Sequence, residues 1–255
     1  MQLTLEGRRA LITGGSRGLG LAMARAFAEA GARVAIVARD PGALEEAAGT
    51  IPGATPVAAD IATEEGCARA FAAADAALGG IDVLVNNAGT SKRGPFMEVT
   101  DAEWQADLDL KLFAAIRLTR LAWPGMAERR WGRIVNVLNT GAKAPPPTGA
   151  PTAVSRAAGM ALTKILAGEG APLGINVNAL LVGKIDSDQW VRRHAADPKG
   201  QTYEEWMAEA GKPIPMGRMG KAEEFAAMAL ALVTGPGDYV TGTAINVDGG
   251  LSPVV

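Results

Sequence analysis

Short apolar runs alternate with stretches of helical spacing along most of this chain. The runs that have the length and composition of buried strands are Arg8–Thr13, Arg33–Ala38, Thr55–Ala59, Ile81–Val85, Arg133–Leu138, Ile175–Leu180 and Thr243–Val247. The stretches with helical periodicity are Leu19–Ala30, Ala43–Ala48, Glu64–Leu78, Asp101–Met126, Thr152–Gly168 and Ala222–Val233. Strands that are joined through helices pair in parallel with right-handed crossovers. The order therefore predicts an α/β fold with a doubly wound parallel sheet.

Two segments do not follow this alternation, the proline-rich Pro145–Pro151 and the polar Lys184–Pro215. We expect both to be irregular, and long irregular loops in compact domains are often functional. No linker or internal repeat divides the 255 residues. We therefore expect a single domain over residues 1–255.

The charge balance excludes several kinds of partner. The chain has 25 basic and 27 acidic residues without a block of like charge, whereas a nucleic-acid surface needs a basic stripe.

Cys67 is the only cysteine, which favours a reducing compartment. No apolar run approaches the roughly 18 residues of a membrane span, and Met1–Ala10 has no signal-peptide pattern. We expect a cytoplasmic protein with no nucleic-acid partner, no membrane partner and no metal site.

A glycine-rich motif lies between the first strand and the first helix. It reads Thr13-Gly14-Gly15-Ser16-Arg17-Gly18-Leu19-Gly20. Glycines let the backbone approach a pyrophosphate, and the start of the helix adds N–H donors and a positive dipole end. A tight turn without a ligand is the alternative, since the chain has 32 glycines. The position of the motif after the first strand favours nucleotide binding.

Further motifs follow in a fixed order. They are Asp60-Ile61, Asn86-Asn87-Ala88-Gly89, Gly132-Arg133-Ile134-Val135-Asn136, Gly217-Arg218-Met219-Gly220, Thr241-Gly242 and Val247-Asp248-Gly249-Gly250. With the glycine motif, they make the chain resemble the short-chain dehydrogenase/reductase family over essentially its whole length. The resemblance implies a Rossmann-type three-layer α/β/α sandwich, usually a homotetramer, that binds a nicotinamide cofactor and a small-molecule substrate.

The resemblance also implies which residues contact the cofactor. They are Gly14, Ser16, Arg17, Gly18, Leu19 and Gly20 in the loop, Asp60 and Ile61 beside the adenine, Asn87, Ala88 and Gly89 on the cofactor floor, and Ser187 at the carboxamide. The segment 184–215 would cover the substrate.

The end of the second strand indicates the preferred cofactor. Enzymes that use NAD place an acidic residue there to bind the ribose 2′-hydroxyl. This chain has Ala38 followed by Arg39, and Arg17 can converge on the same place. Two guanidinium groups suit a 2′-phosphate, so we predict NADP(H). The alternative is that both arginines are ordinary solvated residues.

The residues that usually perform catalysis in this family are replaced. The family acts through asparagine, serine, tyrosine and lysine, and the last two follow a Tyr-x-x-x-Lys pattern. Those positions correspond here to Lys111, Asn139, Thr152 and Arg156. A threonine hydroxyl is no substitute for a phenol with a pKa of about 10. Arg156 can bind ribose hydroxyls, but it cannot exchange protons. The chain is therefore predicted to be a divergent member that lacks the tetrad.

Lys111 is one candidate for the missing proton donor, because a neighbouring Arg156 would lower its pKa. The alternative is a helix lysine paired with Asp107 or Asp109. Asn139 would orient a substrate carbonyl or else cap the loop. Lys143, His194 and Tyr203 are further candidates, whereas Tyr239 is expected to pack in the core.

Two functions remain open. The first is an NADP(H)-dependent oxidoreductase that acts on a carbonyl or imine, with a cationic pocket that favours an anionic substrate. The second is a nucleotide-binding protein without redox turnover: a sensor, an assembly subunit or a lyase.

Small residues on Thr152–Gly168 and the apolar tail Tyr239–Val255 favour a homotetramer.

Overall fold

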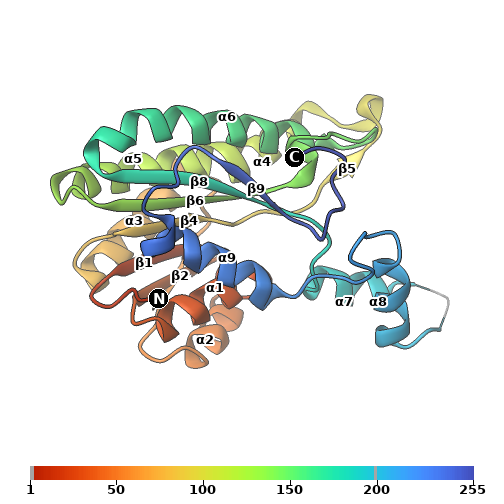
Figure 1. Ribbon diagram of the computed structural model, residues 1–255, viewed down its shortest axis with the longest axis horizontal. Coiled ribbons are helices and arrows are strands. Elements are labelled where there is room, and N and C mark those ends of the chain that lie inside the picture. Colours follow the sequence, from red (N-terminus) through yellow and green to blue (C-terminus); the bar gives the residue numbers. More distant parts are fainter. Residues whose placement is uncertain (1–2, 198–199) are drawn as a thin grey trace.

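A seven-stranded parallel sheet forms the centre of the molecule, with the order β3-β2-β1-β4-β6-β8-β9 (Figure 1). The computed structural model describes residues 3–197 and 200–255, except for the side chains of residues 188, 189 and 192. The strands are β1 (Arg9–Thr13), β2 (Arg33–Ala38), β3 (Thr55–Ala58), β4 (Val83–Asn86), β6 (Gly132–Asn139), β8 (Ile175–Val182) and β9 (Ala244–Val247). This sheet confirms the predicted doubly wound α/β fold.

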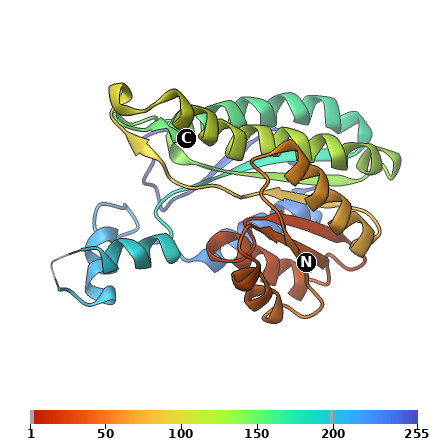
Figure 2. The ribbon, with the colours of Figure 1, turned by 180° about the vertical axis from the view of Figure 1, so that it is seen from behind.

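Helices cover both faces of the sheet and make three layers (Figures 1 and 2). One face packs against α1 (Gly18–Glu29), α2 (Pro41–Gly49) and α9 (Ala222–Val233). The other packs against α3 (Glu64–Leu78), α5 (Ala114–Glu128) and α6 (Thr152–Gly170). Each face has its own apolar core, because the strand residues are buried on both sides of the sheet.

The long helix predicted over Asp101–Met126 is interrupted. It consists of α4 (Asp101–Leu108), a π-helical segment η2 (Asp109–Phe113) and α5. Isolated π turns inside helices are often found at functional sites. Lys111 lies within this turn and is buried.

The expectation of an irregular 184–215 segment was wrong. It contains α7 (Asp188–Ala195) and α8 (Tyr203–Gly211), and α8 begins with a capping box between Thr202 and Glu205. The two helices pack through aromatic rings, with the centroids of Trp190 and Trp206 5.8 Å apart. Sequence reasoning missed them because they pack on each other and add little apolar surface to the core. We call residues 184–215 the lobe, which projects beyond the carboxyl ends of the strands (Figures 1 and 2).

The proline-rich segment remains mostly irregular and ends in the short strand β7 (Ala150–Pro151). This strand pairs antiparallel with β5 (Arg93–Gly94). Tyr239, expected in the core, is instead fully exposed. Its neighbour Val240 packs against the core, and the backbone oxygen of Val240 accepts a hydrogen bond from the Nδ2 of Asn178 at 2.7 Å.

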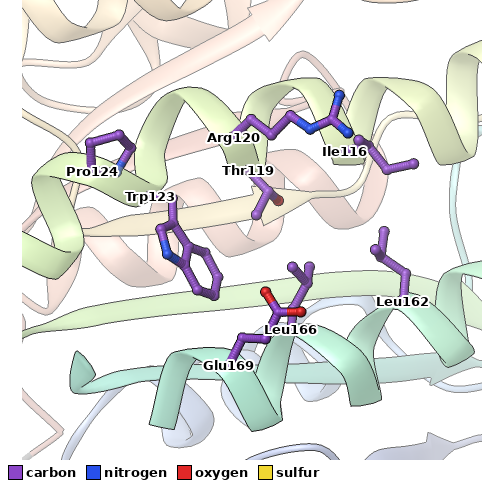
Figure 3. Close-up of a pocket in the computed structure, with 8 residues that line it drawn as sticks. All are labelled: Ile116, Thr119, Arg120, Trp123, Pro124, Leu162, Leu166 and Glu169. Carbon is purple, nitrogen blue, oxygen red and sulfur yellow. The ribbon is translucent and has the colours of Figure 1, made fainter. Parts of the chain in front are cut away.

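An apolar groove runs between α5 and α6 on the outer surface (Figure 3). The residues that line it are Ile116, Thr119, Arg120, Trp123, Pro124, Leu162, Leu166 and Glu169. Val154 and Ile165 on α6 are also more than half exposed. In the described part of the chain, no helix is both long and apolar enough to cross a membrane.

Candidate active site

The glycine loop has the backbone geometry of an anion cradle. Gly14 and Gly18 have φ angles of +66° and +53°, which disfavour any residue with a side chain. A Cβ atom at Gly20 would overlap the carbonyl oxygen of Gly14. The helix α1 starts after Arg17, whose side chain makes no capping hydrogen bond. The first backbone N–H groups of α1 therefore have no side-chain cap and can bind an anion.

Asn87 holds the glycine loop against β4. Its Nδ2 donates to the backbone oxygens of Thr13 at 2.8 Å and Gly14 at 3.2 Å. The Oγ1 of Thr13 accepts hydrogen bonds from the backbone nitrogens of Asn87 and Ala88 at 2.9 and 3.0 Å. These bonds fix the floor of the predicted cofactor site. Both N–H groups of the Asn87 side-chain amide are used to hold the loop.

The other predicted cofactor residues lie around this loop. A Cβ atom at Gly18 would lie 3.6 Å from the Cβ of Ser187, so the lobe begins beside the loop. Arg17 and Arg39 are exposed, and neither has a salt-bridge partner in residues 3–197 or 200–255. Ile61 is buried, whereas the Asp60 carboxylate accepts a hydrogen bond from the backbone nitrogen of Ala62 at 3.1 Å.

A buried polar cluster lies where α4, η2 and α6 meet. Lys111 donates from its Nζ to the Oδ1 of Asp107, in a salt bridge whose side chains are 0% and 2% exposed. The same Nζ lies 2.7 Å from the Oγ1 of Thr152. Ser155 donates to the Oδ2 of Asp107 at 2.6 Å. The structure thus brings Lys111 and Thr152 together around Asp107, one of the two partners expected for the lysine.

The hydroxyl of Thr152 is fully engaged. It donates to the carbonyl oxygen of Lys92 at 2.7 Å and accepts from the backbone nitrogen of Lys92 at 3.2 Å. It also accepts from Lys111. A hydroxyl has one hydrogen and two lone pairs, so none remains for another partner. Thr152 therefore connects the chain before β5 to the start of α6.

Arg156 lies beside Lys111 and Gly89. Its guanidinium donates to the carbonyl oxygen of Val137 at 2.8 Å. A Cβ atom at Gly89 would collide with the Arg156 guanidinium and would lie 3.7 Å from the Cε of Lys111. A larger residue at position 89 would therefore require the Arg156 guanidinium to move, whereas Lys111 would remain in ordinary contact.

Burial and neighbouring charges shift both pKa values. Burial lowers the pKa of Lys111 to about 8; the bond to Asp107 opposes this shift, and the charges of Arg156 and Arg93 add to it. Burial also lowers the pKa of Arg156 to about 10, against the influence of Asp107. The charge of Arg156 lowers the pKa of Lys111, as the sequence predicted, but the loss of hydration on burial lowers this pKa more.

Asn139 ends β6, and it does not cap the following turn η3 (Thr140–Ala142). Its Oδ1 is buried and has no hydrogen-bond partner in the described part of the chain. Buried polar atoms are normally satisfied, so this acceptor at the end of β6 is a place for a ligand donor.

The other candidate proton donors form hydrogen bonds outside the Lys111 cluster. Lys143 donates to the carbonyl oxygen of Ala244 at 2.7 Å. The Nε2 of His194 lies 2.8 Å from the carbonyl oxygen of Gln201, and its ring packs edge-on against Tyr203. The hydroxyl of Tyr203 donates to Asp186. The described residues contain no group of three or more histidine, cysteine or acidic side chains that could hold a metal ion.

Comparison with known proteins identifies the family. A family model described as Enoyl-(Acyl carrier protein) reductase matches residues 14–252. A short chain oxidoreductase from Pseudomonas aeruginosa PAO1 that contains an atypical catalytic center superposes with a TM-score of 0.93 at 35% identity, over 99% of this chain and 100% of that one. The chain belongs to the short-chain dehydrogenase/reductase family. This confirms the resemblance and makes the chain an enzyme of that family.

Other members of the family are similar over nearly all of their length. Acetoacetyl-CoA reductase of Shinella zoogloeoides is 35% identical over 95% of this chain and 98% of its own. L-Sorbose reductase from Gluconobacter frateurii, complexed with NADPH and L-sorbose, gives a TM-score of 0.95 at 33% identity and covers 100% of both chains. These short-chain dehydrogenase/reductase relatives are oxidoreductases.

Proposed function

We propose that this enzyme transfers hydride between NADP(H) and the carbonyl or imine carbon of a small anionic substrate, with Lys111 as the proton donor. The observation that carries the proposal is the buried Lys111, whose pKa is about 8, beside Gly89 and Arg156. An acid works best when its pKa lies near the working pH. The reductase relatives, one of them complexed with NADPH and a ketose, support the same class of reaction.

The residues described above fit a dinucleotide phosphate. The uncapped start of α1 suits a pyrophosphate, and the exposed guanidinium groups of Arg17 and Arg39 suit a 2′-phosphate. The full set of proposed cofactor residues is Gly14, Ser16, Arg17, Gly18, Leu19, Gly20, Arg39, Asp60, Ile61, Asn87, Ala88, Gly89, Arg156 and Ser187. The cofactor supplies or accepts the hydride when it is bound.

Lys111, Asn139, Thr152 and Arg156 occupy, in this proposal, the positions of the family's asparagine, serine, tyrosine and lysine. Thr152 is not the acid, because its hydroxyl is saturated by Lys92 and Lys111. During reduction, Lys111 passes a proton to the oxygen or nitrogen of the substrate and becomes a neutral amine that solvent reprotonates. Arg156 stays charged and stabilises the developing negative charge. The unpaired Oδ1 of Asn139 accepts a hydrogen bond from the ligand.

One observation favours the alternative without redox turnover. Asp107, Lys111, Thr152 and Ser155 satisfy one another, as they would in a purely structural cluster. NADPH absorbance, followed with a panel of ketones, imines and keto acids, separates the two functions when cofactor binding is measured separately by calorimetry. We expect binding and consumption. Binding without consumption of NADPH by any compound would favour the non-redox function.

A further inference from the structure

Two exposed arginines lie on short elements beyond the carboxyl ends of the strands, Arg93 on β5 and Arg193 on α7 (Figures 1 and 2). Arg93 lies on β5 and pairs in register with Pro151, the residue before Thr152. Both backbone groups of the preceding Lys92 are hydrogen-bonded to the Thr152 hydroxyl. The Arg93 side chain is exposed, and its backbone directly follows Lys92, which contacts the site. The hydrogen bonds between Lys92 and Thr152 therefore fix the backbone position of Arg93.

The second arginine, Arg193, lies on α7 of the lobe. Its guanidinium carbon lies 4.6 Å from the ring centroid of Trp190, which orients the side chain. Burial lowers the pKa of Arg193, and the charge of Arg93 lowers it further. Arg93 also contributes, after burial and Arg156, to the lowered pKa of Lys111. Arg93 therefore lies within electrostatic range of both the lobe arginine and the buried lysine. β5 and α7 lie beyond the same ends of the strands (Figures 1 and 2).

No carboxylate in residues 3–197 and 200–255 that the structure describes forms a salt bridge with Arg93 or Arg193. Lys92, next to Arg93, by contrast pairs with Glu103 at 2.7 Å. Two carboxylates of the lobe are engaged by aromatic donors: Asp186 by Tyr203, and Asp197 by Trp206 at 2.7 Å. In the cluster below, one carboxylate, Asp107, faces two cations.

We propose that Arg93 and Arg193 form a binding site for a carboxylate or phosphate group of the substrate, at the end remote from the reacting carbon. The inference rests on the proposed function, since it names the class of substrate for the same site. Guanidinium groups bind both anions through two parallel hydrogen bonds. An anion between the two arginines also relieves their mutual repulsion. One arginine lies on β5 and the other on α7, so an acidic substrate would link the lobe to the β5–β7 pair.

Matched substrates test this site. Keto acids of increasing chain length, their neutral amides and keto-alkyl phosphates of the same lengths are each offered with NADPH. We expect an acid or a phosphate to have a KM at least about tenfold below that of its neutral counterpart, as one charge-assisted hydrogen-bonded pair provides. Comparison of the two anionic series shows whether a carboxylate or a phosphate is preferred.

Arg93→Gln and Arg193→Gln should each raise the KM for the acidic substrate, relative to the KM for the neutral amide with the same variant, by about tenfold. Arg69→Gln, at an exposed arginine on α3, is the matched control and should change neither. Equal KM values for acids and amides, or no effect of either variant, would overturn the anion site.

Failure of the anion site can be distinguished from failure of the proposed reaction. If neutral ketones are reduced without any preference for acids, the enzyme is a reductase and the anion site is wrong. If nothing is reduced, the matching hydroxy acids are titrated into the NADP complex by calorimetry. Binding that Arg93→Gln and Arg193→Gln weaken would then support the anion site while the redox proposal fails. No binding would overturn both.

Discussion

Lys111 experiences opposing influences from its neighbours. Burial and the charges of Arg156 and Arg93 lower its pKa, whereas Asp107 raises it through a hydrogen bond and its charge. Without Asp107, an ammonium that is 0% exposed would be left among cations, with the Thr152 hydroxyl but no negative charge as its partner. Asp107 thus acts as a positioning residue that keeps Lys111 protonated near neutral pH, as a proton donor requires.

Replacement of Asp107 by asparagine should move the pH profile of reduction. Reduction uses the protonated amine, so its kcat/KM should fall as the pH rises through about 8 in the parent enzyme. Asp107→Asn removes a negative charge, lowers the pKa of Lys111 further and should move this alkaline limb down by about one pH unit or more.

Ser155→Ala is the control for Asp107→Asn, since it removes a hydrogen bond to Asp107 and no charge. Its alkaline limb should stay close to that of the parent. NADPH binding measured on both variants verifies that the site is folded. An unshifted limb in a folded Asp107→Asn variant would show that Lys111 is not the titrating donor.

Arg39 should determine the choice of cofactor. NADPH is expected to bind at least about tenfold more tightly than NADH, because a guanidinium pairs with the 2′-phosphate and not with a hydroxyl. Arg39→Ala should remove most of this difference in calorimetric titrations. Arg25→Ala, at an exposed arginine that bonds Thr50, should leave it unchanged. Equal affinities of the parent for both cofactors would contradict the assignment.

Sequence reasoning identified some of these residues and missed others for a clear reason. The Lys111–Asp107 pair follows from a spacing of four residues on a helix, so it was predictable as one alternative. Ser155 was not singled out, and the role of Lys92 depends on pairing between β5 and β7, two strands of two residues each. Contacts made by such short, distant strands leave no periodic pattern in the sequence.

At the scale of elements, the central strands were predicted to within one or two residues. β2, for example, was expected over the six residues that form it, because four of them are buried consecutively. The π-helical turn that contains Lys111 was not predictable, since a π turn alters the helical repeat only locally. Helices α7 and α8 were not predicted, because their apolar residues pack against each other and not against a large core.

The aromatic residues of the lobe should determine its local stability. Trp206 packs against Trp190 and His194 with ring centroids 5.8 Å away in both pairs. Trp206→Ala should weaken the contact by about 1–3 kcal/mol and speed amide hydrogen exchange in α7 and α8, while the sheet stays protected. Trp206→Phe keeps a ring and should have a much smaller effect. Unchanged exchange in the alanine variant would show that the rings do not hold the lobe together.

At the scale of the whole molecule, the groove between α5 and α6 leaves apolar surface uncovered (Figure 3). We predict a homotetramer in which α6 packs against a second copy, since exposed apolar patches of this kind mark association sites. Light scattering should give four chain masses. Ile165→Glu, at a residue that is 57% exposed, should lower the mass.

Met97→Glu is the control for the tetramer, because Met97 is 89% exposed and lies outside the groove. It should leave the mass at four chains. A mass near one chain for the parent protein would contradict the predicted assembly, and an unchanged mass for Ile165→Glu would show that α6 is not part of the interface.

Transfer of deuterium from NADPH labelled at the reactive nicotinamide carbon tests the central claim most directly. The enzyme is incubated with the labelled cofactor and the carbonyl panel, and the products are analysed by mass spectrometry. We expect deuterium on the former carbonyl carbon, and a loss of about 100-fold or more in its rate for Lys111→Met, with NADPH binding retained. Tight NADPH binding with no deuterium in any product, or transfer by Lys111→Met at the parent rate, would contradict the account.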